Sequence, residues 1–319
     1  MKGLWLQDQQ LTYRTDLPGP EVEPGLALIK LRQAGICATD LEMLRGYYPF
    51  TGVPGHEFVG EVVAAPAHEG WVGQRVVGEI NLTCGECDAC RAGRPHHCAN
   101  RTVLGIQGHD GVLAEYFTLP VENLHAVPDG VEDDLATFTE PLAAALEIQE
   151  QVHIRPETRV LVVGAGRLGL LIAQTLRLTG CDLRVVVRRQ APADLLARYG
   201  IEAVFVEDVE ENSADLVVEV TGSPDGFALS RKAVRPAGTL VLKSTFAGDV
   251  TLDLSSVVVD EITLVGSRCG PFDPALCLLE SGLVDLRPMI SARFALSDGL
   301  TAFEKAAEHG ILKVLIYPD

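Results

Sequence analysis

Four cysteines within a short stretch have the type and spacing of a metal-ligand set. They follow the pattern C-x2-C-x2-C-x7-C, and glycines and a proline that favour turns lie between them. The four are Cys84, Cys87, Cys90 and Cys98. Four thiolates can close a tetrahedral zinc shell, and such a shell leaves no open position for a substrate. We therefore expect a structural zinc that holds the loop 84–98.

Two other ligand arrangements compete for this loop. Iron–sulfur clusters also use cysteines in x2 spacing, but here the third gap is long and no Cys-Pro pair follows. His96 and His97 lie inside the loop and offer nitrogen ligands. We prefer the set of four sulfurs.

A second group of candidate ligands lies nearer the N-terminus. Cys37 follows a strand-like run, and His56-Glu57 follows a Pro-Gly turn. Thiolate, imidazole and carboxylate are the three protein ligand types that zinc accepts. Alone the two segments are weak evidence, because a single cysteine commonly packs as a small apolar residue. Their interpretation depends on the rest of the chain.

A glycine-rich turn follows the apolar run Val160–Val163. It reads Gly164-Ala-Gly166-Arg167-Leu168-Gly169 and opens an apolar helical pattern. The first glycine permits the tight turn, the second lets the backbone approach a pyrophosphate, and the third lets the helix pack on the strand. The helix N-terminus offers free N–H groups to the phosphates. Strand, G-x-G-x-x-G and helix in this order predict dinucleotide binding.

The end of the next strand indicates which dinucleotide binds. NAD-binding proteins commonly carry an acidic residue there, about 20 residues after the glycines, which bonds the ribose hydroxyls. Arg188 and Arg189 occupy this place. An anion is favoured between them, so the sequence predicts the 2′-phosphate of NADP. Two solvated arginines at a strand end are the alternative.

Length and composition limit the classes of function. A chain of 319 residues favours two domains. The formal net charge of −18 excludes a nucleic-acid partner, because phosphates would be repelled. Apolar runs are too short to span a membrane, and the N-terminus runs directly into a strand-like pattern, so we expect a cytoplasmic protein. Eight cysteines in such a chain indicate metal or reactive sites rather than disulfides.

The secondary-structure pattern changes along the chain. Residues 1 to about 120 contain short strands separated by Gly and Pro, which is typical of an antiparallel barrel-like domain. Residues 131–152 form a helical pattern in which Pro141 must occupy a first turn or break the helix. Strands and helices then alternate from Arg159, which predicts a doubly wound parallel sheet in an α/β architecture.

The combination of these features, in this order, resembles the zinc-dependent medium-chain dehydrogenases, the alcohol and polyol dehydrogenases. The resemblance covers essentially the whole chain. It implies a GroES-like catalytic β-barrel domain from residues 1–125 and 267–319, which carries the cysteine lobe, and a Rossmann domain from residues 126–266. It also implies a homodimer or homotetramer.

The resemblance supplies the ligands of a catalytic zinc. Cys37 and His56 match two of them, and Glu140 stands where simple alcohol dehydrogenases carry a third, cysteine ligand. The segment Glu140-Pro-Leu-Ala resembles the sorbitol, threonine and glucose dehydrogenase branch. In that branch the counterpart of Glu57 also binds zinc or holds its water. One or both of these glutamates therefore complete the set.

Further roles follow from the same resemblance. Thr39 matches the hydroxyl that relays the substrate proton, and Glu42 stands where many members continue the relay with histidine. Thr221 and Thr245 lie in segments that approach the nicotinamide. Lys313 matches a basic residue that reaches the pyrophosphate in some members, and a solvated lysine at a strand end is the alternative.

We therefore expect an oxidoreductase that transfers hydride between a small-molecule secondary alcohol, such as a polyol or sugar, and NADP or NAD. Two alternatives remain: a zinc-independent reductase of quinones or enones, and a relative that binds the cofactor without turnover. The set of Cys37, His56 and Glu140 argues against the first.

Overall fold

The computed structural model describes residues 1–245 and 250–319. The chain divides into two compact units, Met1–Glu140 with Phe272–Asp319 and Pro141–Pro271. The domain limits expected from the sequence differ from these units at residues 126–140 and 267–271. Among the described residues, no helix has the length and apolar character needed to cross a membrane.

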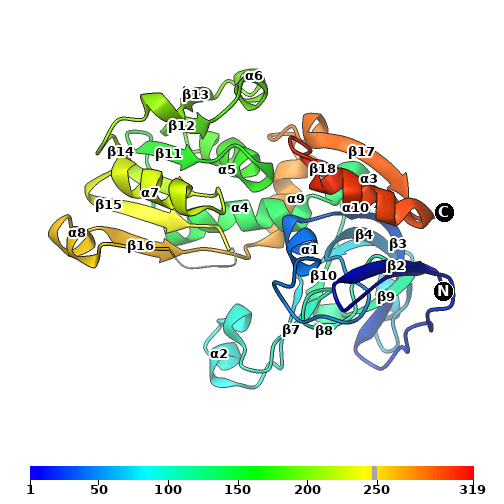
Figure 1. The fold of residues 1–319 in the computed structure, drawn as a ribbon. Helices are drawn as coiled ribbons and strands as arrows, with labels where there is room; N and C mark the ends of the chain where they lie inside the picture. Colours follow the sequence, from blue (N-terminus) through cyan, green and yellow to red (C-terminus); the bar gives the residue numbers. More distant parts are fainter. Residues whose placement is uncertain (246–249) are drawn as a thin grey trace. The chain divides into compact units, whose positions relative to one another are not determined.

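The unit Pro141–Pro271 contains a six-stranded, wholly parallel sheet (Figure 1). Its strands are β11 (Arg159–Val163), β12 (Asp182–Val187), β13 (Glu202–Phe205), β14 (Ala214–Glu219), β15 (Val234–Leu242) and β16 (Thr263–Gly266). The spatial order is β13-β12-β11-β14-β15-β16. The order reverses between β11 and β14, and the carboxyl ends of strands at such a point are where ligands bind in open α/β sheets.

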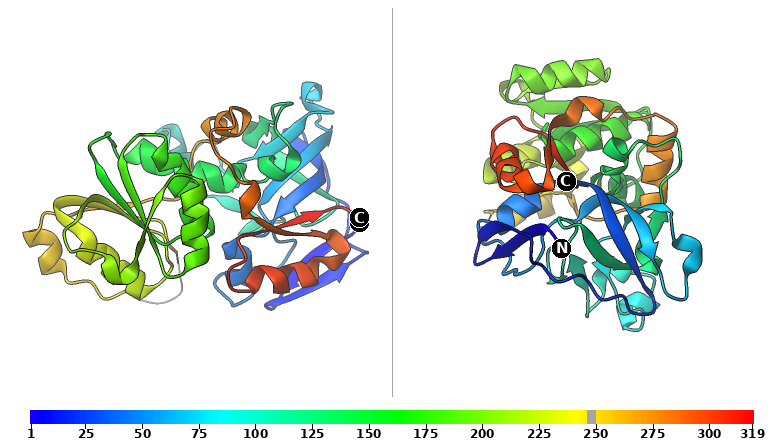
Figure 2. Two further views of the ribbon diagram at one scale, coloured as in Figure 1. Left: turned by 90° about the horizontal axis from the view of Figure 1, so that it is seen from above. Right: turned by 90° about the vertical axis from the view of Figure 1, so that its right-hand side faces the viewer.

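Helices flank this sheet, and Figure 2 shows the twisted fan of strands between them. They are α5 (Arg167–Arg177), α6 (Gln190–Arg198), α7 (Pro224–Ala233) and α8 (Leu254–Val259). Val160–Val163 of β11 are almost completely buried, as expected for a strand covered on both faces. The parallel α/β architecture agrees with the prediction from alternating strand and helix patterns.

The helical pattern of residues 131–152 forms two helices. These are α3 (Asp133–Ala136) and α4 (Thr139–Gln151). Pro141 is the third residue of α4, so its missing N–H lies in the first turn, where the helix would not have used it. Helix α4 is one of the two places where the chain passes from one unit to the other.

The unit Met1–Glu140 with Phe272–Asp319 is mainly β-structure. Its larger sheet has the order β10-β5-β4-β3-β18-β17, and β9 also pairs with β3. The strands of that sheet are β3 (Leu26–Gly35), β4 (Glu57–Ala64), β5 (Arg75–Gly78), β9 (Tyr116–Pro120), β10 (Leu124–Ala126), β17 (Ile290–Ala295) and β18 (Lys313–Tyr317). Two small sheets accompany it, formed by β1 (Gly3–Gln7) with β2 (Gln10–Arg14), and by β6 (Asn81–Leu82), β7 (Thr102–Leu104) and β8 (Gly108–His109).

Short helices connect these strands. They are α1 (Ala38–Met43), α2 (Asp88–Arg91), α9 (Phe272–Glu280) and α10 (Gly299–Ala307). Two pairings of the larger sheet matter for the site. Strand β3 pairs antiparallel with β4 so that Gly35 lies opposite Glu57. Strand β18, from the C-terminal end of the sequence, also pairs antiparallel with β3.

Candidate active site and metal centres

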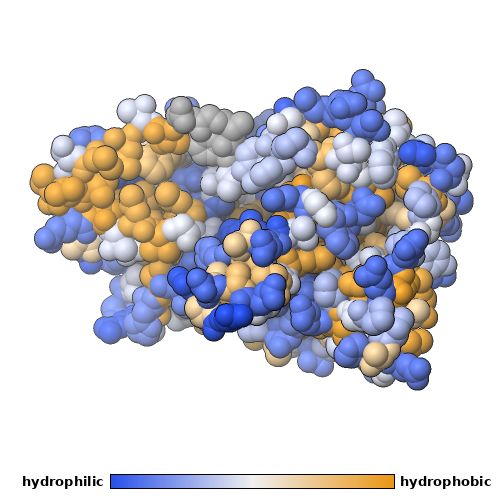
Figure 3. Space-filling view, turned by 90° about the horizontal axis from the view of Figure 1, so that it is seen from below, coloured by the Kyte–Doolittle hydropathy of each residue, from blue (hydrophilic) through white to orange (hydrophobic). Residues whose placement is uncertain are grey.

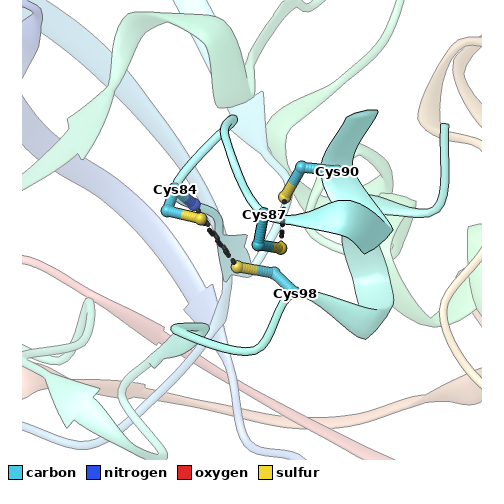
Figure 4. Close-up of side chains that lie close together, drawn as sticks. All are labelled: Cys84, Cys87, Cys90 and Cys98. Atoms are coloured by element: carbon cyan, nitrogen blue, oxygen red, sulfur yellow. Dashed lines mark hydrogen bonds between the residues drawn. The ribbon is translucent and has the colours of Figure 1, made fainter. Parts of the chain in front are cut away.

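The four cysteines of the loop 84–98 gather in one place, as Figure 4 shows. Their sulfur atoms all lie within 4.8 Å of one another. The Sγ atoms of Cys87 and Cys90 are 3.5 Å apart, and those of Cys84 and Cys98 are also 3.5 Å apart. Gly85 has a positive φ of 70°, a conformation that favours glycine at the turn after the first ligand.

Backbone N–H groups prepare this cluster for deprotonation. Hydrogen bonds from the N–H groups of Cys90 and Ala99 lower the pKa of Cys87 to about 6. Burial and the neighbouring Cys87 sulfur instead raise the pKa of Cys90 to about 11. One thiolate therefore forms readily, while a bound cation is needed to keep all four deprotonated at neutral pH. Four sulfur donors at this spacing fit tetrahedral zinc, and the neighbouring His96 and His97 do not belong to the group.

A second ligand group consists of Cys37, His56 and Glu57, whose donor atoms also lie within 4.8 Å of one another. The pairing of β3 with β4 explains why they meet. Cys37 lies two residues beyond the end of β3, and His56 immediately precedes β4, which runs back beside it. The imidazole and the Glu57 carboxylate are buried, so water does not compete strongly for their donor atoms.

Asp40 joins the two ligand segments, and the sequence analysis assigned it no role. Its Oδ2 accepts a hydrogen bond from the backbone N–H of Cys37 at 2.8 Å. Its Oδ1 lies 3.3 Å from Nδ1 of His56. Neither Oδ1 nor Nδ1 has another hydrogen-bond partner in the described part of the chain, so the two atoms interact with each other. A carboxylate on Nδ1 fixes the imidazole so that Nε2 is free to bind a metal.

The electrostatics of this group favour a cation. Burial lowers the pKa of His56, but the charges of Asp40 and Cys37 raise it by more, so that the net pKa is well above its usual range. Without a metal, a proton on the imidazole thus partly neutralises the surrounding negative charge. A divalent cation would do so more completely, and the three donor types present are those that zinc accepts.

Lys313 contacts Glu57 inside the protein. Its Nζ donates to Oε2 of Glu57, and the side chains are only 4% and 1% exposed. The ammonium also lies 5.3 Å from the ring centroid of Phe138. The solvated alternative for Lys313 is therefore wrong. Gly35 makes room for this pair, because a Cβ at that position would lie 2.4 Å from Oε2 of Glu57.

The other residues predicted around the metal lie outside the group of Cys37, His56 and Glu57. Glu140 is the second residue of α4 and does not belong to the group of Cys37, His56 and Glu57. Thr39 Oγ1 lies 3.8 Å from Cys37 Sγ, within reach of any substrate oxygen near that sulfur. Glu42 forms an ion pair with Arg45 on the exposed side of α1.

The glycine-rich turn connects β11 with α5. Gly164 has a φ of +119°, and a Cβ on Gly169 would lie 2.0 Å from the carbonyl oxygen of Gly164. Gly166 precedes the first helical residue, Arg167, and nothing lies within 4 Å of where its Cβ would be. The turn is thus tight where the helix packs on the strand and open where a pyrophosphate would approach. Leu168 and its neighbours begin α5, whose first N–H groups are available.

The other predicted cofactor residues lie near the carboxyl ends of β12, β14 and β15. Arg188 and Arg189 are exposed after β12, and Arg189 immediately precedes the first residue of α6. Thr221 donates from both its N–H and its hydroxyl to Oε1 of the buried Glu219, which fixes the turn after β14. Thr245 is exposed and borders the four residues that are not described.

Comparison with known proteins identifies the family. The family model described as "Alcohol dehydrogenase GroES-like domain" matches residues 23–129, and "Zinc-binding dehydrogenase" matches residues 168–280. The L-threonine 3-dehydrogenase of Escherichia fergusonii is 30% identical over 342 aligned positions, which cover 100% of this chain and 97% of that protein. The chain belongs to the zinc-dependent medium-chain dehydrogenases.

Solved structures of such dehydrogenases have the same fold. A zinc-binding dehydrogenase from Sinorhizobium meliloti 1021, bound to NADP, is 28% identical, and the alignment has a TM-score of 0.92 and covers 99% of each chain. The alcohol dehydrogenase TADH from Thermus sp. ATN1 is 26% identical, with a TM-score of 0.90 over 100% of each chain. The predicted GroES-like and Rossmann architecture is confirmed.

Membership also confirms the predicted class of activity. The protein is a zinc-dependent alcohol oxidoreductase that uses a nicotinamide cofactor. The alternative of a zinc-independent reductase is therefore wrong. The roles of individual residues rest on the geometry described above.

The two ligand groups lead to a prediction about metal content. After incubation with zinc and removal of the excess, the dehydrogenase should contain about two zinc ions per chain, one for each donor set. Cys37→Ala should lose one zinc and keep the fold, whereas the pair Cys84→Ser with Cys98→Ser should lose the other and lower the melting temperature. Atomic absorption with thermal unfolding measures both effects. Two zinc ions retained by Cys37→Ala would contradict the assignment.

Proposed function

We propose that this dehydrogenase reversibly oxidises a secondary alcohol of the polyol or sugar type at a zinc held by Cys37, His56 and one or both of Glu57 and Glu140. The observation that carries the proposal is that the half-buried sulfur of Cys37, the buried ring of His56 and the buried carboxylate of Glu57 place their donor atoms within 4.8 Å of one another. Three protein donors leave a fourth position for a water or a substrate, which distinguishes this group from the four cysteines.

The protein's own residues prepare this site. Zinc and nicotinamide, when bound, supply a Lewis acid that lowers the pKa of the alcohol and an acceptor for the hydride. Asp40 holds the Cys37 backbone and the His56 ring at the same time. Thr39 places a hydroxyl 3.8 Å from the Cys37 sulfur, where it can take the alcohol proton. The charge of Lys313 balances that of Glu57.

Carboxylate ligation suits a polyol dehydrogenase in our proposal. A carboxylate is a harder ligand than a thiolate, so the metal is held less tightly and is more readily lost on purification. The relative of 30% identity is named L-threonine 3-dehydrogenase, and the Glu140-Pro-Leu-Ala segment resembles the branch that includes such enzymes. Both support a substrate more polar than a simple alcohol.

The function is tested with a panel of polyols, sugars and simple alcohols, followed by the absorbance of the reduced nicotinamide. We expect turnover of at least one polyol or sugar. His56→Ala should lower kcat by at least about 100-fold, since removing even an outer partner of a metal ligand costs 10- to 100-fold. Cofactor affinity should be unchanged, because the glycine turn lies in the other unit.

A matched control is His309→Ala, which changes an exposed histidine at the end of α10 and should leave kcat unaltered. An unchanged kcat in His56→Ala would refute the ligand assignment. Cofactor binding without turnover of any alcohol or ketone would instead favour a non-catalytic relative.

We further propose that the cofactor is NADP rather than NAD. Arg188 and Arg189 follow the end of β12, and Arg189 immediately precedes the N-terminus of α6. A guanidinium pair and free helix N–H groups together favour a phosphate. The Sinorhizobium meliloti relative is described as bound to NADP.

This preference predicts a larger kcat/KM with NADP than with NAD. Arg188→Ala with Arg189→Ala should lower kcat/KM for NADP by about 10- to 100-fold, as expected for the loss of charge-assisted hydrogen bonds. The value for NAD should change little. Arg198→Ala, at the opposite end of the same helix, is the control. A clear NAD preference of the unaltered enzyme would sink the proposal.

We also propose that two copies of the chain assemble through α8 and the edge strand β16. Leu254, Val258 and Val259 are 67%, 74% and 79% exposed, and Leu264 on β16 is 39% exposed. Figure 3 shows hydrophobic surface gathered at that end of the unit. Strand β16 is the last of its sheet, and a free strand edge beside apolar surface pairs readily with another strand. A second copy offers the same edge across a two-fold axis.

This surface predicts a dimer, or a tetramer if a second face also associates. Val258→Glu with Val259→Glu should give monomers in light scattering after size exclusion, because two buried carboxylates would oppose association. Val72→Glu alters a valine that is exposed elsewhere and should not change the mass. A monomeric unaltered protein would contradict the proposal.

The state of the cysteines indicates the cellular compartment in which the enzyme works. None of the eight forms a disulfide, and four of them gather in the lobe 84–98. Thiols survive in this state in reducing compartments. We therefore propose a cytoplasmic enzyme.

A further inference from the structure

Lys243 is a buried cation within the unit Pro141–Pro271. It follows β15 directly, and only 8% of the residue is exposed. Its Nζ donates to the carbonyl oxygen of Ala144 at 2.6 Å, to that of Arg268 at 2.8 Å, and to Oγ of Ser267 at 3.1 Å. An ammonium has three donors, and burying it is costly unless they are used. Here all three are engaged.

The acceptors belong to the two stretches through which the chain passes between its units. Ala144 lies in α4, close after the passage at 140/141, and Arg268 precedes the passage at 271/272. The two stretches also touch directly, since a Cβ on Gly270 would lie 2.0 Å from the carbonyl oxygen of Ala143. Lys243 therefore connects the end of β15 by hydrogen bonds to both of these stretches of chain.

The charge of the ammonium also acts on α4. Burial raises the pKa of Glu147, and the charge of Lys243 acts in the opposite direction. Glu147 is one turn along α4 from Ala144, so this charge acts on the same part of the helix to which Lys243 is hydrogen-bonded.

Helix α4 leads from Lys243 to the metal-ligand candidate Glu140. Ala144 and Glu140 are four residues apart in the same helix, so they lie on one face and move together. On its other side, the backbone of Lys243 borders the cofactor end of the sheet. Its N–H donates to the carbonyl oxygen of Glu219 at 3.0 Å, and the next residue, Ser244, accepts from the N–H of Gly222 at 2.8 Å.

We propose that Lys243 is a positioning residue that holds the first turns of α4 and, through this helix, the carboxylate of Glu140. The inference rests on the proposed function and takes Glu140 to be one of the ligands of the catalytic zinc. It gives a reason for placing a costly buried cation where an apolar side chain would fill the same space.

The test measures zinc retention as well as turnover. Lys243→Met keeps the length of the side chain and removes the three donors. It should speed the loss of one zinc to a chelator by about 10- to 100-fold and lower kcat by a similar factor, the usual effect of removing an outer partner of a metal ligand. The zinc of the cysteine lobe and the affinity for NADP should stay within about threefold.

Combination with Glu140→Gln separates positioning from general destabilisation. If Lys243 acts through Glu140, Lys243→Met should have little further effect on zinc loss in the Glu140→Gln background. Equal effects of Lys243→Met in both backgrounds would overturn the inference, as would wild-type zinc retention in Lys243→Met or in Glu140→Gln. None of these results would contradict the proposal that alcohols are oxidised at Cys37 and His56, which the substrate panel tests separately.

A milder variant keeps the inference testable if Lys243→Met does not fold. Ser267→Ala removes one of the three acceptors and leaves the two carbonyl groups. It should speed zinc loss by about three- to tenfold, as expected for one hydrogen bond. Unchanged zinc loss in a folded Ser267→Ala protein would count against the proposal.

Discussion

The buried carboxylate of Asp40 is the contact on which the candidate active site depends. It bonds the backbone of Cys37 and faces the ring of His56, so one side chain holds both segments that supply ligands. Its position follows from local structure. Asp40 is the third residue of α1, whose N-cap is Cys37, and an acidic residue at that place bonds back to the cap. The helix start that positions the carboxylate is therefore the one that presents the thiol.

Charge balance explains why a divalent cation belongs at this site. With a metal bound, Cys37 would be a thiolate, so that Cys37, Asp40 and Glu57 would be three negative groups, and Lys313, in contact with Glu57, is one positive group. The net charge of these four groups would then be two negative units in a largely buried site. Burying that charge costs free energy unless a cation neutralises it. Burial lowers the pKa of His56 and the charges of Asp40 and Cys37 raise it by more, which reflects the same negative surroundings. Zinc supplies both positive charges and uses the neutral imidazole as a ligand.

The features predicted from the sequence are those that short stretches determine. The cysteine lobe and the glycine turn each lie within 15 residues, so spacing alone indicates their geometry. Asp40 lies three residues after Cys37 in the sequence, but its contact with His56 depends on how β3 pairs with β4. Lys313 is 256 residues from Glu57, and no local pattern relates them. Glu140 was assigned by resemblance, whereas the geometry groups Glu57 with Cys37 and His56.

The path of the chain has a consequence for how the metal site forms. Cys37, His56 and Glu57 come from the first part of the sequence, but the cation that balances Glu57 comes from β18 near the C-terminus. Strand β18 joins this sheet beside β3 only after the whole dinucleotide-binding unit has been made. Gly35, which lies opposite Glu57 on β3, comes from the first part of the chain and leaves the space in which this ion pair lies. The counter-charge of Glu57 in the candidate site is therefore supplied by the strand that is synthesised last.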